Sequence, residues 1–133
     1  MRTHPFDLKN ELNGKVFEHI KDLSAHSDIV EQLLTAVKPL GDVQVFTPDG
    51  PESYRYYTVS TKGIIFGFAI GMDTIAFRVN LTFKERALAS GASPCPDCGP
   101  DWVAFKAFRS DWPRPDWEFW ARKAYVDVRE TTP

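Results

Sequence analysis

Several features that would assign this chain to a functional class are missing from its sequence. Of its 133 residues only two are cysteines, and no apolar run approaches the roughly 18 residues needed to cross a bilayer. The first residues, MRTHPFDLKNELNGK, contain no apolar segment typical of a secretion signal. The formal net charge of −2 gives no basic excess of the kind a general nucleic-acid binder carries. We therefore expect a cytoplasmic protein in a reducing setting, without a membrane partner. The charge disfavours a nucleic-acid partner, although a local basic patch stays open.

Catalytic signatures are also missing. The sequence has no G-x-S-x-G nucleophile motif, no phosphate-binding P-loop and no H-E-x-x-H metalloprotease motif. These absences favour a non-enzymatic binding or regulatory module that acts through protein–protein contacts. We expect such a module to have a protein partner or to self-associate, as a homodimer or other homo-oligomer, through its last helix or a sheet edge.

What is present suits one folded domain over residues 1–133, since 43% of the residues are hydrophobic and 14% aromatic. Apolar residues recur at helical spacing near both ends of the chain. The first helix has an apolar face made of Leu8, Leu12, Val16, Ile20 and Leu23. A second helix is expected to begin at Ser27 and end before Pro39, and a last helix carries an apolar stripe from Trp117 to Val128.

Between these helices the apolar spacing changes to two, which is typical of strands. Strands are expected over 42–47, 54–61, 63–71, 74–82 and 102–108, with a short helix over 83–92. The sequence therefore predicts an α+β fold, with a mostly antiparallel sheet of about five strands packed by the N- and C-terminal helices.

The third of these strands, GIIFGFAIG, combines bulky and small residues. Strict alternation predicts one bulky face, which consists of Ile64, Phe66, Phe68 and Ile70. The opposite face would carry Gly63, Ile65, Gly67, Ala69 and Gly71. Such a small face allows close approach to the backbone, either by a packed helix or by a ligand or second subunit.

From Gly63 to the C-terminus the order of features resembles the small α+β domains of the YjbR/MmcQ type and the N-terminal domain of the TfoX competence regulators. The likeness rests on GIIFGFAIG, DTIAFRV, a short helix with SGASP, DWVAFKAF and a closing helix with KAYVDV. This resemblance implies a binding or regulatory role, and it assigns no functional residue.

Both cysteines lie in one short stretch, SPCPDCGPDW. Cys95 and Cys98 have the spacing of half a zinc site, so zinc is the cofactor that the sequence suggests. On one continuous helix His19 and His26 would lie about 10 Å apart, so at most one of them can join the cysteines. Further ligands would be Asp97, Asp101, His4, a water molecule or a second subunit, whose own cysteine pair would complete a four-cysteine site. A proline-stiffened turn with two free thiols and a redox pair stay open as alternatives.

Aromatic and basic residues suggest two further sites. Tyr54, Tyr56, Arg78 and Lys106 stand on expected strands and would form a small-ligand or nucleotide site, and hence an enzyme, if they share a sheet face. The alternative is ordinary cross-strand pairing. Trp112, in a loop, and Trp117 are candidates for a protein interface.

Overall fold

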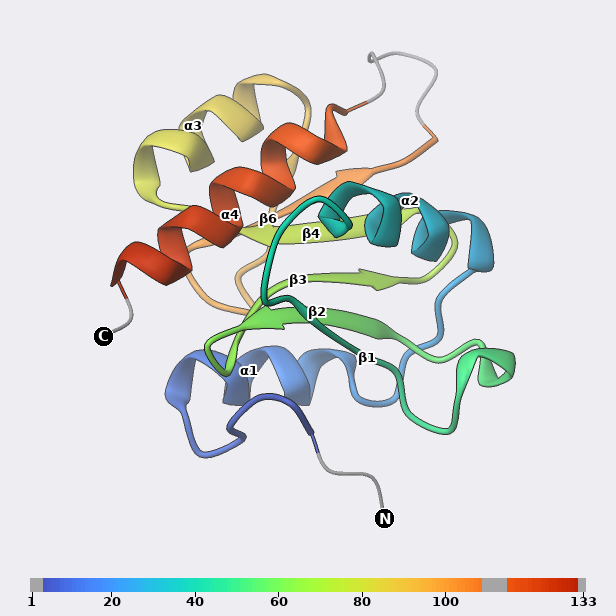
Figure 1. Cartoon of the computed structure of the whole chain (residues 1–133). Coiled ribbons are helices and arrows are strands. Elements are labelled where there is room, and N and C mark those ends of the chain that lie inside the picture. The colour runs from blue at the N-terminus through green and yellow to red at the C-terminus, as the bar shows by residue number, and fades with distance from the viewer. Residues whose placement is uncertain (1–3, 109–114, 132–133) are drawn as a thin grey trace.

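A six-stranded sheet organises the part of the chain that the structure describes, residues 4–108 and 115–131 (Figure 1). In this computed structural model the strand order is β1-β2-β3-β4-β6-β5, and every neighbouring pair is antiparallel. The strands are β1 (Gln44–Phe46), β2 (Tyr57–Thr61), β3 (Ile64–Ile70), β4 (Thr74–Arg78), β5 (Ser93–Pro94) and β6 (Trp102–Lys106). The helices are α1 (Glu11–Ile20), α2 (Ser27–Val37), α3 (Leu81–Ala89) and α4 (Trp117–Thr131), with a 3-10 turn η1 at Pro51–Ser53.

The predicted α+β fold is confirmed, with one strand more than expected. The additional strand, β5, has two residues and one of them is proline, so it shows no alternation that a sequence could reveal. The expected strand over 74–82 ends earlier, at Arg78, because Asn80 caps α3 by accepting a hydrogen bond from the Phe83 amide at 3.1 Å.

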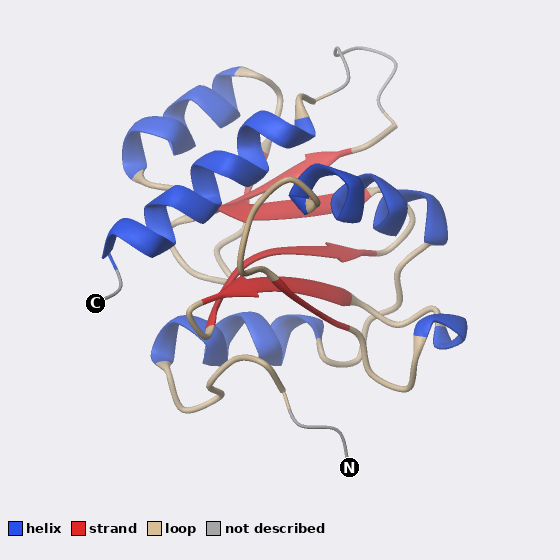
Figure 2. Cartoon of the chain, viewed as in Figure 1, coloured by secondary structure: helices blue, strands red, loops and turns tan. Residues whose placement is uncertain are grey.

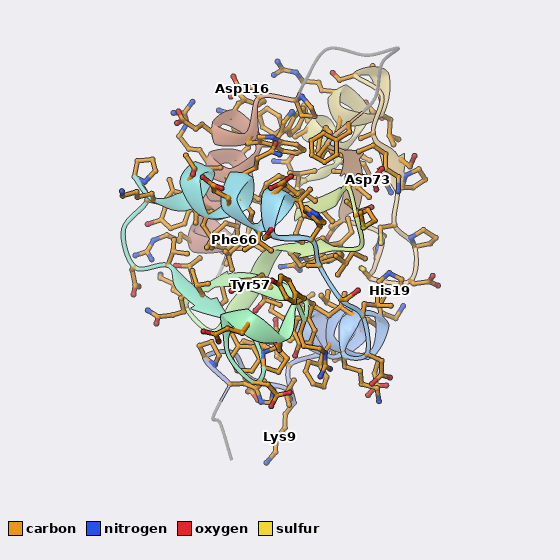
Figure 3. The ribbon with its side chains drawn as sticks, turned by 90° about the vertical axis from the view of Figure 1, so that its right-hand side faces the viewer. Lys9, His19, Tyr57, Phe66, Asp73 and Asp116 are labelled. Atoms are coloured by element: carbon orange, nitrogen blue, oxygen red, sulfur yellow. The ribbon has the colours of Figure 1, made fainter. Side chains whose placement is uncertain are left out.

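The helices divide unequally between the two faces of the sheet (Figure 2). One face is covered by α2, α3 and α4, and its core is dominated by aromatic and aliphatic side chains. The opposite face is covered by α1 and the N-terminal segment, over a smaller core with Phe68 and Trp102 at its centre. Figure 3 shows Tyr57 and Phe66 inside the molecule, whereas Lys9 and Asp116 lie near its two ends. We call the sheet face covered by α2, α3 and α4 the α4 face, and the sheet face covered by α1 the α1 face.

A β-bulge in β3 overturns the predicted bulky face. Val59 of β2 pairs with Gly67, but the next residue, Ser60, pairs with Ile65, so Phe66 is an extra residue in the ladder. The alternation therefore reverses at this point, and Phe66 packs in the core of the α4 face while Phe68 packs in the core of the α1 face. The prediction that both lie on one face was wrong because strict alternation cannot register a bulge.

Gly63, Gly67 and Gly71, in or beside β3, do not form one small-residue surface for a ligand or a second subunit. A Cβ atom on Gly67 would come within 3.0 Å of Val59 Cγ2 and 3.1 Å of the Phe77 ring, so side chains of the two neighbouring strands fill that space. Gly63 and Gly71 stand in turns at φ of 76° and 68°, the left-handed region that glycine adopts without strain. The regular glycine spacing thus combines two turn residues with one packing residue.

Helix α1 is shorter than expected, and its buried face is rotated. The buried residues are Asn13, Val16 and Ile20, while Leu12 is 43% exposed. Leu8 and Leu23, which the sequence placed on the same apolar face, lie outside the helix and are partly exposed. Asn13 is therefore buried against the sheet, whereas Leu12, which the apolar spacing placed on the buried face, is on the exposed side.

Candidate metal centre

Helix α1 is fixed on the sheet by a buried asparagine. The Asn13 amide nitrogen donates hydrogen bonds of 2.8 Å to the carbonyls of Asp7 and Gly63, and its Oδ1 accepts one of 2.9 Å from the Ile65 amide. All three partners are backbone groups at the start of β3 or in the segment before α1. The sequence analysis did not identify Asn13. Its position, three residues before Val16 and seven before Ile20, puts it on the same side of the helix as these apolar residues, and this spacing was a signal that it is buried.

This anchor determines where His19 lies. His19 stands in the last turn of α1, one residue before the fully buried Ile20, and its side chain is 27% exposed. Its ring centroid is 6.5 Å from that of Phe68 in β3. The imidazole therefore sits at the rim of the α1 face, partly sheltered by the core.

The two cysteines belong to a tight turn between β5 and β6. The Cys95 amide donates to the Trp102 carbonyl at 3.1 Å, which ties the start of the turn to β6. The Cys98 amide donates back to the Cys95 carbonyl, also at 3.1 Å, and Gly99 follows with a φ of 135°. This turn points both thiols to the same side, with their Sγ atoms 3.1 Å apart.

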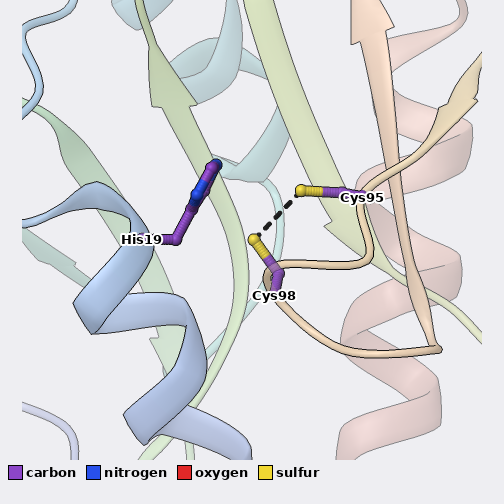
Figure 4. Close-up of side chains that lie close together, drawn as sticks. All are labelled: His19, Cys95 and Cys98. Atoms are coloured by element: carbon purple, nitrogen blue, oxygen red, sulfur yellow. Dashed lines mark hydrogen bonds between the residues drawn. The ribbon is translucent and has the colours of Figure 1, made fainter.

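The turn and the end of α1 meet, although they are far apart in the sequence. One ring nitrogen of His19 and the Sγ atoms of Cys95 and Cys98 all lie within 4.8 Å of one another (Figure 4). No other group of three or more possible metal ligands of this kind occurs among the described residues. Cys98 is 3% exposed and Cys95 is half-buried, so the donors lie at the edge of the core.

The distances between these donors suit a tetrahedral zinc ion after small side-chain adjustments. Zn–S bonds of about 2.3 Å and Zn–N bonds of about 2.0 Å place tetrahedral donors roughly 3.6–3.8 Å apart. The two sulfurs are 3.1 Å apart, somewhat closer than this range, and no two donors of the group are more than 4.8 Å apart. Imidazole and thiolate are also the ligands that zinc prefers.

The two thiols differ in acidity. The hydrogen bond from Cys98 lowers the pKa of Cys95, while the same bond and burial raise the pKa of Cys98. A metal ion must displace the proton from each thiol that it binds. The redox interpretation stays a prediction; no helix begins at Cys95, the position that usually activates a redox cysteine.

The other candidate ligands are placed differently. His26 caps α2, where its Nδ1 accepts a hydrogen bond of 3.1 Å from the Asp28 amide. His4 packs against the rings of Phe6, Phe17 and Phe46. Asp101 lies 4.0 Å from Arg78, and the Asp97 carboxylate lies 3.9 Å from His19 Nδ1. The structure therefore brings His19, and Asp97 beside it, to the cysteine pair.

The predicted tyrosine and arginine site is not brought together. Tyr54 is 62% exposed in a loop, whereas Tyr56 is 2% exposed in the core of the α1 face, and burial raises its pKa. Arg78 and Lys106 stand opposite Trp102 and Thr74, roughly 13 Å apart along β4 and β6. Lys106 contacts Asp73 at 3.4 Å. These four residues occupy separate parts of the molecule.

Of the two tryptophans predicted to lie at a protein interface, the structure describes one, Trp117. Trp112 lies outside the described residues. Trp117 is 6% exposed, packs against Phe77 and Phe105, and donates a hydrogen bond of 2.8 Å from Nε1 to Gln32. In this chain Trp117 contributes to the core of the α4 face.

Comparisons with known proteins do not assign this chain to a family. No protein-family model, no curated protein and no solved structure matches this chain. The resemblance to the YjbR/MmcQ and TfoX domains therefore stays a prediction. No helix among the described residues has the length and apolar character to span a membrane. His19, Cys95 and Cys98 are the one group of three possible metal ligands of this kind in the part of the chain that the structure describes.

Proposed function

We propose that this chain is a metal-dependent binding protein that holds one zinc ion at His19, Cys95 and Cys98. The observation that carries the proposal is the meeting of three zinc-type donors from two distant segments within 4.8 Å. The ion would join α1 to the β5–β6 turn at the rim of the α1 face. This role agrees with the non-enzymatic binding or regulatory module that the sequence favours.

The local structure supports a built site over a chance cluster. The turn is closed by backbone hydrogen bonds at both cysteines, and α1 is fixed by the three hydrogen bonds of Asn13. Donors held by rigid elements lose little conformational freedom when they bind a metal, which favours affinity. The partly exposed His19 and Cys95 leave an entry path for the ion.

A zinc titration of the reduced, full-length chain against a chromophoric chelator tests the proposal. We expect one zinc ion per chain with a dissociation constant below about 1 μM, which corresponds to roughly 8 kcal/mol of binding free energy. His19→Ala, Cys95→Ser and Cys98→Ser should each weaken binding at least about 100-fold, since each removes a donor bound directly to the ion.

His26→Asn is the matched control, because asparagine retains a cap acceptor for α2 and the residue lies outside the donor group. It should bind zinc like the unaltered chain. His19→Ala is the most informative variant, since its partly exposed side chain is replaced with little effect on the core. Zinc binding of unchanged strength in His19→Ala, or no stoichiometric zinc in the unaltered chain, would contradict the proposal.

A further inference from the structure

We infer that the metal ion in this centre keeps its fourth position for a small neutral ligand from outside the chain, a water molecule when no other ligand is present. This inference rests on the proposed zinc site and deepens it by naming what the site binds. Structural zinc sites are closed by four protein ligands, whereas sites that bind substrates keep three protein ligands and one open position. The described residues supply three donors that lie within 4.8 Å of one another.

A further possible donor, the carboxylate of Asp97, lies beside His19. Its Oδ2 lies 3.9 Å from His19 Nδ1, its side chain is 79% exposed, and it does not belong to the group of mutually close donors. A histidine that binds zinc through one ring nitrogen commonly donates its other N–H to a carboxylate. A side-chain movement that closes the 3.9 Å separation would let Asp97 accept a hydrogen bond from Nδ1–H, which leaves Nε2 for the metal and the fourth position free.

Two hollows border the donor group, one at His19 and the other at Cys98. One, of about 640 Å³, is lined by His19 and Asp97 together with Leu8, Phe17 and Glu18. The other, of about 460 Å³, is lined by Cys98 and Trp102. Lys15 borders both of them. Each hollow has room for a ligand of a few non-hydrogen atoms beside the donor that it exposes, His19 in the larger one and Cys98 in the smaller one.

The lining of the larger hollow favours a neutral ligand. Its charged residues are Lys15, Glu18 and Asp97, and Glu18 already contacts Lys21 at 3.0 Å. A zinc ion with two thiolates carries no net charge, so neither the metal centre nor the lining attracts an anion strongly. Leu8 and Phe17 add apolar surface that suits the flat body of a nitrogen heterocycle.

The test uses the full chain loaded with Co²⁺, whose visible absorption reports its ligands, and imidazole as the neutral probe. We expect thiolate-to-cobalt absorption, and a shift of the visible bands that saturates at one imidazole per chain. Azide, the anionic probe, should need at least about tenfold higher concentration for a comparable shift. Asp97→Asn should lower cobalt affinity roughly 10–100-fold and still respond to imidazole. Asp49→Asn, a carboxylate change at a residue that contacts Arg55 and borders neither hollow, should behave like the unaltered chain.

Three results would overturn the inference. Visible bands that ignore imidazole in the unaltered chain but respond in Asp97→Asn identify Asp97 as the fourth ligand. Bands that ignore imidazole in both proteins show a closed site, and loss of thiolate-to-cobalt absorption on adding imidazole shows extraction of the metal. If the thiolate-to-cobalt absorption never forms, the metal site itself fails, and that outcome is distinct from a closed but occupied site.

Discussion

The two faces of the sheet are built by different means. On the α4 face, aromatic rings from the sheet pack directly on those of α4, as Phe105 does on Trp117 and Trp120 at centroid distances of 5.9 and 5.2 Å. The α1 face has a smaller core and depends on specific polar contacts, foremost those of buried Asn13. The candidate metal centre lies on this second face. A large hydrophobic core on one side leaves the other side free to carry polar groups whose arrangement serves binding.

Truncation of Trp120 should have the largest effect and the least connection to metal. Its side chain is 6% exposed and packs on Phe105, Phe119 and Phe83. We expect Trp120→Ala to lower the free energy of unfolding by about 4 kcal/mol, because it leaves a large cavity. Urea unfolding should give the same loss with and without zinc. A loss that depends on zinc would show that the two faces are not energetically separate.

Replacement of Asn13 should produce the next largest loss, on the α1 face. Asn13→Ala leaves the carbonyls of Asp7 and Gly63 and the Ile65 amide without this partner, at an expected cost of about 3 kcal/mol. Leu12→Ala, on the exposed side of the same helix, is the control and should cost less than about 1 kcal/mol. Equal losses in the two variants, measured by urea unfolding, would mean that hydrophobic packing alone holds α1.

Zinc removal should destabilise the α1 face by a comparable amount. At a free zinc concentration of about 100 times the dissociation constant, binding adds roughly 2.7 kcal/mol to the stability of the folded chain. A strong chelator should therefore lower the thermal midpoint of the unaltered chain far more than that of His19→Ala, whose weaker site adds little stability at the same zinc concentration. Equal sensitivity of both proteins to the chelator would place the bound metal elsewhere.

The smallest expected effect is a gain in stability. The buried hydroxyls of Thr58 and Ser60 in β2 have no hydrogen-bond partner among the described residues. Thr58→Val should stabilise the fold by about 1 kcal/mol, because it replaces an unsatisfied polar group with a methyl group of similar size. Thr61→Val, on the α4 face of the same strand, should destabilise, since the Thr61 hydroxyl accepts a hydrogen bond of 2.8 Å from Arg129. Thermal unfolding of both variants checks the contrast, and a loss in Thr58→Val would refute it.

The sequence predicts the α4 face far better than the α1 face. The apolar stripe from Trp117 to Val128 gives α4 and its buried side directly, because a continuous hydrophobic contact leaves a regular period. The bulge at Phe66 leaves no such period, because it depends on the register between strands. The helical spacing places Asn13 with Val16 and Ile20, but it does not reveal the backbone groups, distant in the sequence, to which Asn13 is bonded. For the candidate site, spacing identifies the cysteine pair and limits the histidines to one, and tertiary structure selects His19 over His26.

X-ray absorption at the zinc edge of the reduced, zinc-loaded full chain identifies the atoms bound to the metal and therefore tests the proposed zinc site. We expect two sulfur ligands at about 2.3 Å and two nitrogen or oxygen ligands at about 2.0 Å, one of them an imidazole. In His19→Ala the imidazole signal should be lost while both sulfur ligands remain. Four sulfur ligands would show a site shared between two copies of the chain, and a shell without sulfur would show that Cys95 and Cys98 do not bind the metal. Either result would contradict a single-chain site made of His19, Cys95 and Cys98.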